Sequence, residues 1–471
     1  MSYPFDPRRP GRNDFTPELA PDSSEIMVVR RIRREVAERL TRATRAHETA
    51  TGAVMSAVEQ QETTRRLITE TLDVYATEEM NAGRPPLRPD AESRVARSVA
   101  DMLLGAGGLQ PLLNDERVED INANGCDQVF VRYTDGSKVQ VGPIADSDAE
   151  MVELIRRLAA DAGRAETGGE GAEERRWDRA APILRLQLPD GSRLQAVMSV
   201  TRRPSLSIRR HHYIKVTLAD LQQLGTLNPA LRAFFAATVR ARLNTLAAGR
   251  TGAGKTTFLR ALASEIPADE RLVTIEDTYE LALDADKALH PDVVPMQSRD
   301  ANVEGQGAID MSELFRSGLR MSPDRVIVGE IRGHEVIPML NAMSQGNDGS
   351  LGTIHASSTA GVFKKLALYA RQSPERLEPP TTNLLVAESV HLVVHLTLTD
   401  GGRRVVTSVR EVVDADDRSI ASNEIFRPGP DGRAVPGSPP STALLTTLAN
   451  AGFNPGLLDE ARTAPGGGWS S

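Results

Sequence analysis

Eight consecutive residues, Gly249 to Thr256, have the types and the spacing of a phosphate-binding loop. They read Gly-Arg-Thr-Gly-Ala-Gly-Lys-Thr, the full pattern G-x-x-x-x-G-K-S/T. Glycines let backbone N–H groups converge on a polyphosphate where side chains would block the approach. Lys255 supplies a positive charge, and the hydroxyl of Thr256 is the usual Mg²⁺ ligand. The pattern predicts a nucleoside triphosphate site, for which the candidate binding residues are Gly249, Arg250, Thr251, Gly252, Ala253, Gly254, Lys255, Thr256 and Thr257.

The segments on either side of this loop have the patterns that such a loop needs. Residues 243–248 can form a buried strand, and residues 257–263 have the apolar spacing of a helix. A helix that begins near Lys255 would point its partially positive N-terminus at the phosphates. This context favours a functional loop over a chance match in a glycine-rich turn.

Two further apolar runs end in carboxylates that suit ATP hydrolysis. Residues 325–330 end in Glu330, the Walker B arrangement, where a carboxylate polarises water or holds the metal through water. Residues 272–277 end in Glu276 and Asp277, which lie beside the phosphate loop if the two strands are neighbours in a parallel sheet. Either acid alone would more often cap the next helix, but two such runs after a phosphate loop favour catalysis. The candidate metal ligands are Thr256, Glu276 and Glu330.

Residues 346–356 combine glycines, hydroxyl side chains and His355. A single histidine usually has a structural role. The dense glycines before His355 nevertheless indicate a loop that approaches a ligand closely, where an imidazole can sense the γ-phosphate.

Composition excludes several classes of protein. The 471 residues include 56 Lys+Arg and 64 Asp+Glu, and the net charge of −8 argues against a broad preference for nucleic acid. Cys126 is the only cysteine, so we expect no intramolecular disulfide and no cysteine-rich metal site. No run approaches the roughly 20 apolar residues of a membrane-spanning helix, and we expect no transmembrane segment, no signal peptide and a cytoplasmic location.

Patterning along the chain predicts an α+β domain before an α/β domain. Hairpins are expected at 128–141 and 184–198, with a helix at 148–162 between them. From about residue 216, helices alternate with short apolar strands, which predicts a mostly parallel, helix-covered sheet. The expected strands of this sheet are 243–248, 271–276, 325–329 and 391–396.

Five segments result from this patterning. They are a disordered N-terminus (1–24), a helical arm and linker (25–90), the α+β N-terminal domain (91–215), the α/β domain (216–426) and a largely disordered C-terminal tail (427–471) with one short helix at 442–451. The arm carries the cluster Arg30, Arg31, Arg33 and Arg34. These arginines suit anionic lipid or a partner, although a solvated helix face is the favoured explanation.

Four blocks in family order resemble the type II/IV secretion ATPases, and specifically the CpaF-like branch that powers Tad-type pilus assembly. The resemblance covers about residues 95–415. The blocks are the Walker A loop at 249–256, the Asp box at 275–281, the Walker B segment at 319–333 and the His box that ends at 353–356.

The resemblance implies a homohexameric ring in which an N-terminal domain rests on a RecA-like ATPase domain, with ATP and Mg²⁺ bound between them. Glu330 would be the catalytic glutamate, Glu276 and Asp277 would support Mg²⁺ and water, and His355 would couple the γ-phosphate to domain movement.

Arginines are also expected to line that cleft and to neutralise charge in the transition state. Arg209 and Arg210 match the family's segment best, and the weaker candidates are Arg299, Arg320 and Arg332. One departure is Asn347, where many relatives carry a histidine. An amide cannot transfer a proton, so a proton-transfer role at this position is in doubt.

The preferred interpretation is a cytoplasmic ring ATPase that passes its motion to an inner-membrane platform protein of a pilus or secretion machine. It would be peripherally associated with that membrane machinery. The first alternative is a nucleic-acid motor for conjugation or unwinding, which the net charge and an aromatic content of 4% disfavour. The second is a nucleotide-binding scaffold with little turnover, which Asn347 leaves open.

Overall fold

The computed structural model describes residues 25–53, 55–166, 177–188, 190–210, 215–299, 306–399, 401–463 and 468–469. The disorder expected for residues 1–24 lies outside this set. The chain divides into two compact units, of which unit 1 contains Met1–Arg185 and Leu194–Arg209 and unit 2 contains Leu186–Arg193 and Arg210–Ser471. Each unit is described by itself.

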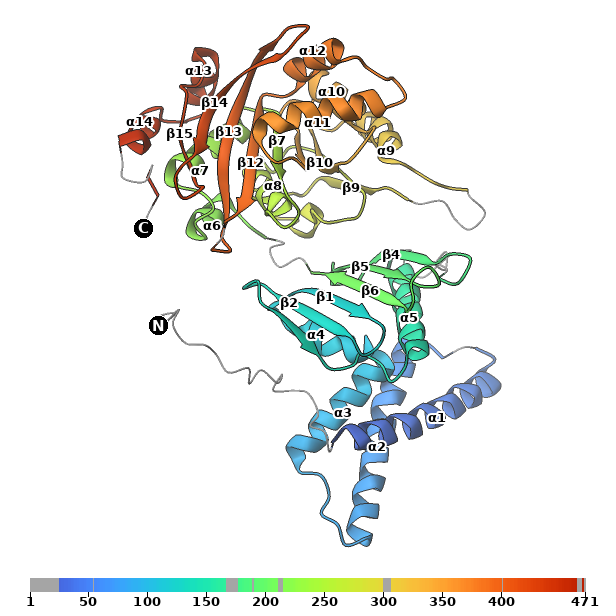
Figure 1. Cartoon of the computed structure of the whole chain (residues 1–471). Coiled ribbons are helices and arrows are strands. Elements are labelled where there is room, and N and C mark those ends of the chain that lie inside the picture. The colour runs from blue at the N-terminus through green and yellow to red at the C-terminus, as the bar shows by residue number, and fades with distance from the viewer. Residues whose placement is uncertain are drawn as a thin grey trace. The chain divides into compact units, whose positions relative to one another are not determined.

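Three helices form the first part of unit 1 (Figure 1). They are α1 (Glu25–Thr51), α2 (Ala57–Asn81) and α3 (Pro89–Leu104). The predicted arm is therefore broken, because Ser56 and Glu59 form a capping box that starts α2. The helices share one apolar core, made of Val29, Ile32, Val36, Leu67, Ile68, Leu72, Val95 and Val99.

The arginine cluster of α1 is largely neutralised within unit 1. Arg30 pairs with Asp146 at 2.8 Å and Arg31 pairs with Glu78. Arg33 also pairs with Asp146, at 3.2 Å. Exposed pairs of this kind add little stability, but they leave the cluster with less net charge than its sequence indicates.

A six-stranded sheet forms the second part of unit 1, in the order β3-β2-β1-β6-β5-β4. Its strands are β1 (Val118–Asn124), β2 (Val129–Tyr133), β3 (Lys138–Val141), β4 (Ile183–Gln187), β5 (Arg193–Val197) and β6 (Ser205–Arg209). The short helix α4 (Gln110–Asn114) precedes the sheet, and α5 (Asp148–Glu166) connects its halves. Both predicted hairpins are confirmed, whereas the central strand β1 was not predicted. The tip of the β4–β5 hairpin, Leu186–Arg193, clusters with unit 2.

Unit 2 is built on a nine-stranded sheet in the order β15-β14-β13-β12-β7-β11-β10-β8-β9. The pairings from β12 to β9 are parallel, and those from β12 to β15 are antiparallel. The parallel strands are β7 (Thr245–Gly249), β8 (Leu272–Glu276), β9 (Val293–Gln297), β10 (Arg325–Ile331), β11 (Leu351–Ile354) and β12 (Leu392–Leu398). The antiparallel strands are β13 (Arg404–Ala415), β14 (Ile420–Pro428) and β15 (Ala434–Pro436). The predicted mostly parallel sheet is confirmed.

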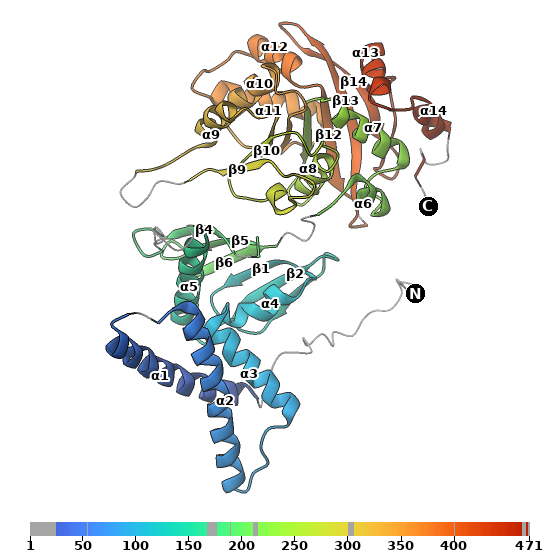
Figure 2. The ribbon, with the colours of Figure 1, turned by 180° about the vertical axis from the view of Figure 1, so that it is seen from behind.

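Helices cover both faces of this sheet (Figure 1, Figure 2). One face packs against α6 (Leu218–Gln223), α7 (Pro229–Arg240), α8 (Lys255–Ala263), α13 (Thr442–Asn450) and α14 (Gly456–Thr463). The other packs against α9 (Met311–Gly318), α10 (Val336–Ser344), α11 (Thr359–Gln372) and α12 (Pro379–Ser389). This is the layered α/β architecture expected for strands that alternate with helices. Within the described residues, no helix combines the length and the apolar character that crossing a bilayer requires.

The prediction of a largely disordered C-terminal tail is wrong for the part that the structure describes. Residues 434–463 form β15, α13 and α14, and Leu448 is fully buried. The ring of Phe453 contacts that of Phe234 on α7 edge-on, with 5.8 Å between centroids. Prolines and glycines in this segment lie between the elements or at their ends, as Pro436 and Gly456 do, so their abundance marks the boundaries of ordered elements.

Candidate nucleotide-binding site

The candidate phosphate-binding loop, residues 249–256, connects the buried strand β7 to the first turn of α8, as the flanking patterns predicted. Gly254, at the N-cap of α8, has φ +90°, a conformation that side chains rarely adopt. Gly249 is required for another reason, because a Cβ there would lie 2.5 Å from the carbonyl oxygen of Leu396 on β12. The glycines of the motif therefore serve the backbone path of the loop, which leaves its N–H groups at the helix N-terminus.

Lys255 is buried, with 8% of its surface exposed. Its Nζ donates to the carbonyl oxygen of Arg250 at 3.3 Å and lies 4.0 Å from Oε1 of Glu330. It is also 3.4 Å from Nδ1 of His355. Burial lowers the pKa of Lys255 because it disfavours the charged ammonium, and the nearby Glu330 opposes that shift.

Glu330 lies on β10 and contacts two further cationic or titratable side chains. Its Oε1 pairs with Nε2 of His355, and its Oε2 accepts from Nε of Arg332 at 2.5 Å. His355 reaches this position because β11, which it follows, lies between β7 and β10. Burial, followed by the charge of Lys255, lowers the pKa of His355. The structure thus brings together Lys255, Glu330 and His355, three residues that the sequence selected independently.

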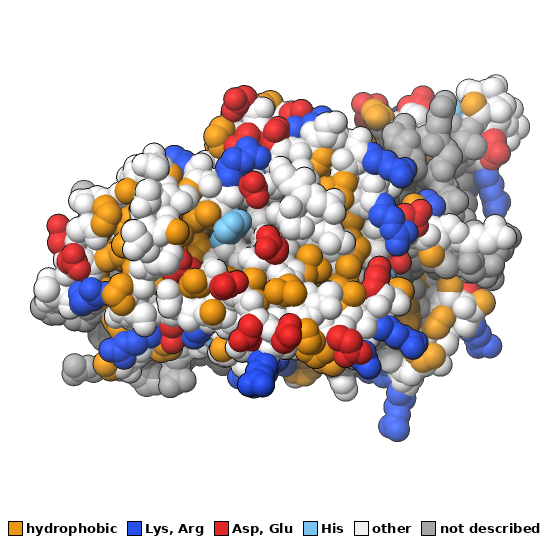
Figure 3. All heavy atoms as spheres, turned by 90° about the horizontal axis from the view of Figure 1, so that it is seen from above, with side chains coloured by type: hydrophobic (Ala, Val, Ile, Leu, Met, Phe, Trp, Pro, Cys, Tyr) orange, Lys and Arg blue, Asp and Glu red, His pale blue; other side chains and the backbone are white. Residues whose placement is uncertain are grey.

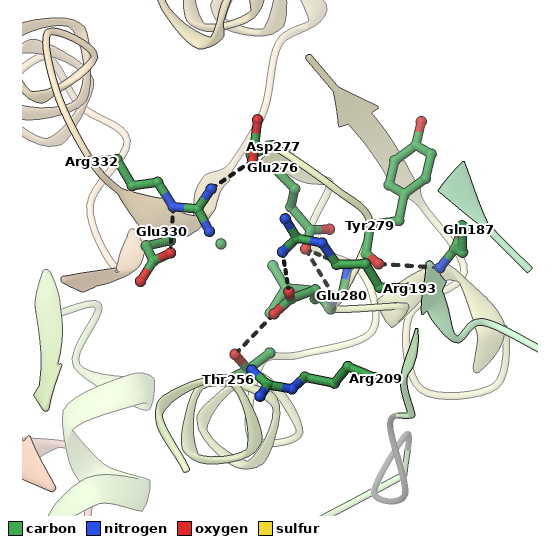
Figure 4. Close-up of polar contacts among 12 residues, drawn as sticks. Gln187, Arg193, Arg209, Thr256, Glu276, Asp277, Tyr279, Glu280, Glu330 and Arg332 are labelled. Atoms are coloured by element: carbon green, nitrogen blue, oxygen red, sulfur yellow. Dashed lines mark hydrogen bonds and ion pairs between the residues drawn. The ribbon is translucent and has the colours of Figure 1, made fainter. Parts of the chain in front are cut away.

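Arg332 links the ends of two neighbouring strands. Besides Glu330 it donates to Oδ2 of Asp277, with Nη1 at 2.6 Å (Figure 4). Asp277 also accepts from Oγ of Ser298 at 3.1 Å. The sequence ranked Arg332 among the weaker arginine candidates, yet it is the one that contacts the acid of the Walker B strand.

Glu276 is the most buried of the acids at this site, with 1% of its surface exposed. Its Oε2 accepts the backbone N–H groups of Glu280 at 2.8 Å and Leu281 at 2.9 Å. Its Oε1 has no hydrogen-bond partner among the described residues. Burial raises the pKa of Glu276 to about 7, against the opposing effect of the two N–H donors.

Glu280 is a site residue that the sequence reasoning missed. Its Oε2 lies 3.5 Å from Oγ1 of Thr256, and its Oε1 lies 3.3 Å from Nη1 of Arg193 (Figure 4). Gln187, from the same hairpin tip as Arg193, donates to the carbonyl oxygen of Tyr279 at 3.1 Å. A signal was available for Glu280, because it is the third acid of the Asp box, after Glu276 and Asp277.

The donor atoms around Thr256 suit a hard cation. The Thr256 hydroxyl and the Glu280 carboxylate supply oxygen ligands, which Mg²⁺ prefers. Among the described residues, no three His, Cys, Asp or Glu side chains gather as a metal site of their own. Such a set fits an ion that keeps several waters and shares its shell with phosphate oxygens.

Three of the four remaining arginine candidates have partners of their own. Nε of Arg209 donates to Oδ1 of Asp120 at 2.8 Å, and Arg210 lies 4.0 Å from Asp190. Nε of Arg299 donates to the carbonyl oxygen of Gly307 at 2.8 Å. Arg320 is exposed in the turn after α9.

One further arginine contacts this loop. Arg404, the first residue of β13, donates from Nε to the carbonyl oxygen of Gly252 at 2.9 Å. No sequence pattern pointed to it.

Asn347 donates from Nδ2 to the carbonyl oxygen of Pro323 at 2.7 Å. Asn347 and Pro323 precede β11 and β10, so they lie at the amino ends of the parallel strands, opposite the loop that follows β7.

Comparison with known proteins identifies the class. Residues 104–422 match the family described as "Type II/IV secretion system protein", and the chain belongs to that family. A "Putative conjugal transfer protein" of Mycobacterium tuberculosis (strain H37Rv) is 35% identical over 325 residues, which cover 67% of this chain and 87% of the relative.

Two further proteins are similar to this chain, one over a shorter alignment and one at lower sequence identity. The type IV secretion system protein PtlH of Bordetella pertussis (strain Tohama I) is 34% identical over 257 residues, which cover 48% of this chain and 74% of PtlH. The VirB11 ATPase of Brucella suis, whose crystal structure was solved in complex with sulphate, is 27% identical in sequence to this chain. The structural alignment covers 64% of this chain and 91% of VirB11, with a TM-score of 0.34.

Proposed function

We propose that this protein is an ATP-hydrolysing motor of a type II/IV secretion or pilus machine. The observation that carries the proposal is the mutual contact of Lys255, His355 and Glu330. Lys255 follows the loop after β7, His355 follows β11 and Glu330 lies on β10, and these three strands are adjacent in the sheet. A phosphate-binding lysine beside a strand-end glutamate is the arrangement that nucleotide hydrolysis requires. Membership of the secretion family supports the coupling of hydrolysis to transport.

In this proposal the residues divide the work as follows. Lys255 and the N–H groups of the loop hold the β- and γ-phosphates of ATP. Thr256 and Glu280 hold Mg²⁺ directly or through water, and that ion neutralises charge on the phosphates when it is bound. Glu330 accepts a proton from the water whose oxygen attacks the γ-phosphorus, while the bond to the ADP oxygen breaks.

Side chains around Glu330 have supporting roles. Arg332 orients its carboxylate through the 2.5 Å hydrogen bond. His355 contacts both Lys255 and Glu330, so its position responds to what those two groups bind. We further propose that Arg193, Arg209 and Arg210 supply positive charge to the transition state.

The finer assignments rest on the family resemblance. We propose a homohexameric ring, a cytoplasmic location at the inner face of the membrane, and an inner-membrane platform protein as the partner. Within the family we propose the CpaF-like branch and assembly of a Tad-type pilus. The four sequence blocks support this choice.

A nucleic-acid motor is the second candidate, and the conjugal transfer name of one relative favours it. The charge distribution disfavours it. On the face seen in Figure 3, Lys and Arg side chains lie scattered among Asp and Glu and form no continuous stripe. The net charge of −8 adds to this argument. The scaffold alternative loses its main support, because Asn347 lies at the opposite edge of the sheet from the phosphate loop.

Steady-state ATP hydrolysis tests the proposal. Purified protein would be assayed over a range of protein concentrations, with and without single-stranded DNA, beside Lys255→Ala and the exposed control Lys287→Ala. We expect turnover that needs Mg²⁺, rises with assembly, ignores DNA and falls by more than about a hundredfold in Lys255→Ala alone. Stimulation by DNA would favour the nucleic-acid motor, and ATP binding without turnover would favour a scaffold.

A further inference from the structure

The backbone of Glu280 and Leu281 is hydrogen-bonded from two sides by buried ionisable side chains. On one side, Oε2 of Glu276 accepts both N–H groups, at 2.8 and 2.9 Å. On the other side, the guanidinium of Arg260 donates to both carbonyl oxygens, with Nη2 on Glu280 and Nε on Leu281 at 2.9 Å. Four backbone groups of two consecutive residues are thereby satisfied by two side chains.

Both of these side chains are almost completely buried. Glu276 is 1% exposed and Arg260 is 5% exposed. Burial of a carboxylate or a guanidinium is costly unless hydrogen bonds compensate for the lost water. Glu276 and Arg260 are therefore both buried, at a cost in desolvation, against one short stretch of backbone. Packing alone does not explain why two ionisable side chains occupy this place.

The backbone that these two side chains hold, Glu280–Leu281, carries the side chain of Glu280 next to Thr256. The side chain of Glu280 places Oε2 at 3.5 Å from the Thr256 hydroxyl. Thr256 and Arg260 are four residues apart on α8, so they lie on the same face of one helix. The helix that presents the Thr256 hydroxyl therefore also holds the backbone of Glu280, and a single turn of helix sets the distance between the two groups.

The carboxylate of Glu276 is itself confined. A Cβ at Gly329, the residue before Glu330, would lie 3.0 Å from Cγ of Glu276 and 3.2 Å from its Oε2. A larger residue at this position would therefore push the Glu276 side chain by a few tenths of an ångström. Glu276 thus packs against β10 while it holds the loop after β8.

We propose that Glu276 and Arg260 are positioning residues that hold Glu280 at Thr256, and that Glu276 does not itself bind Mg²⁺ or the attacking water. This inference rests on the proposed function, since Glu280 is taken as a holder of the nucleotide-bound ion. It replaces the role that the strand-end pattern indicated for Glu276. The two roles differ in what they need: positioning needs an acceptor oxygen, whereas catalysis or metal support needs a negative charge.

Two substitutions at Glu276 separate these roles. In Glu276→Gln the amide oxygen can still accept both N–H groups, so we expect kcat within about threefold of wild type. In Glu276→Ala the acceptor is gone, and a displaced Glu280 should lower kcat by about ten- to a hundredfold while the Kd for ATP changes less than about threefold. The exposed residue Glu388 provides matched controls, Glu388→Gln and Glu388→Ala. A kcat for Glu276→Gln as low as that for Glu276→Ala would overturn the inference.

Arg260→Lys tests the other half of the clamp. A lysine offers one compact ammonium and cannot present the fixed fork of donors that spans two carbonyl oxygens. We expect kcat to fall by roughly tenfold with little change in the Kd for ATP. Unchanged kcat in this variant would remove Arg260 from the proposal.

Hydrogen–deuterium exchange gives a readout that does not depend on turnover. The amides of Glu280 and Leu281 should be protected in wild type and in Glu276→Gln, and should exchange much faster in Glu276→Ala. Protection of the distant strand β12 monitors the fold of each variant. If the wild type lacks ATPase activity, the proposed function fails. The exchange pattern still tests whether Glu276 holds the backbone of Glu280 and Leu281. Equal exchange at these two amides in all three proteins would overturn it.

Discussion

Two neighbouring strands of unit 2 end in the same sequence pattern and present their acids in opposite ways. Glu276 at the end of β8 is 1% exposed, and its carboxylate accepts backbone N–H groups. Glu330 on β10 has a side chain that is 17% exposed and contacts Lys255, His355 and Arg332. A strand-end carboxylate is thus not by itself a catalytic group. Its partners decide its role.

Strand pairing explains the difference. Val328 pairs with Ile275, so Gly329, and not Glu330, comes next to Glu276. The pairing of β10 with β11 shifts register between Val328 and Ile331, the stretch that contains Glu330. Such irregularities re-aim a side chain without changing the sequence pattern around it. The comparison between the two strand ends therefore makes predictions that differ residue by residue.

The largest effect is expected at Glu330. Glu330→Gln removes the proton acceptor but keeps the shape of the side chain, so kcat should fall by about 10²- to 10⁴-fold. ATP binding should persist, because Lys255 and the loop are intact. Single-turnover hydrolysis and a nucleotide titration measure the two quantities. Equal loss of turnover in Glu330→Gln and Glu276→Gln would erase the distinction between the strand ends.

A smaller effect is expected at Arg332, which connects the two ends through Glu330 and Asp277. Its side chain is 46% exposed, so solvent screens part of the interaction. Arg332→Gln should lower kcat by on the order of tenfold, because Glu330 loses a charged hydrogen-bond donor. Steady-state kinetics beside the exposed control Arg316→Gln measure this effect. Wild-type kcat in Arg332→Gln would show that Glu330 does not need Arg332 as an orienting partner.

Arg404 tests whether the antiparallel part of the sheet supports the loop. Arg404→Met keeps much of the aliphatic volume but loses the hydrogen bond to Gly252. One such bond is worth about 1 kcal/mol, so the Kd for ATP should rise by about fivefold, with kcat nearly unchanged. The exposed residue Arg403, just before β13, provides the control Arg403→Met. A change in kcat alone would assign Arg404 to the reaction and not to the loop.

The sequence predicted the parts of the site that are local in the chain. The phosphate loop, its strand and its helix follow from spacing within about fifteen residues, and so does the acid of β10. The roles of Glu276, Glu280 and Arg404 depend on strand order and on contacts between distant segments, which periodicity does not encode. The tail was misjudged for a related reason, because its apolar residues find their core on α7, far away in the sequence.

The smallest combined effect on ATP binding and turnover is expected at Asn347, whose unusual identity raised doubt about activity. Its Nδ2 donates to Pro323, and its own carbonyl oxygen accepts from Oγ of Ser350 at 2.7 Å. Both contacts lie at the amino ends of β10 and β11, so Asn347→Ala should change kcat less than about twofold while the loss of one hydrogen bond costs about 1 kcal/mol of stability. Thermal unfolding and ATP hydrolysis measured on the same preparation check both parts. A tenfold loss of kcat without a lower Tm would mean that the two edges of the sheet are coupled. The difference between the carboxyl ends of β8 and β10 would then no longer be enough to account for catalysis.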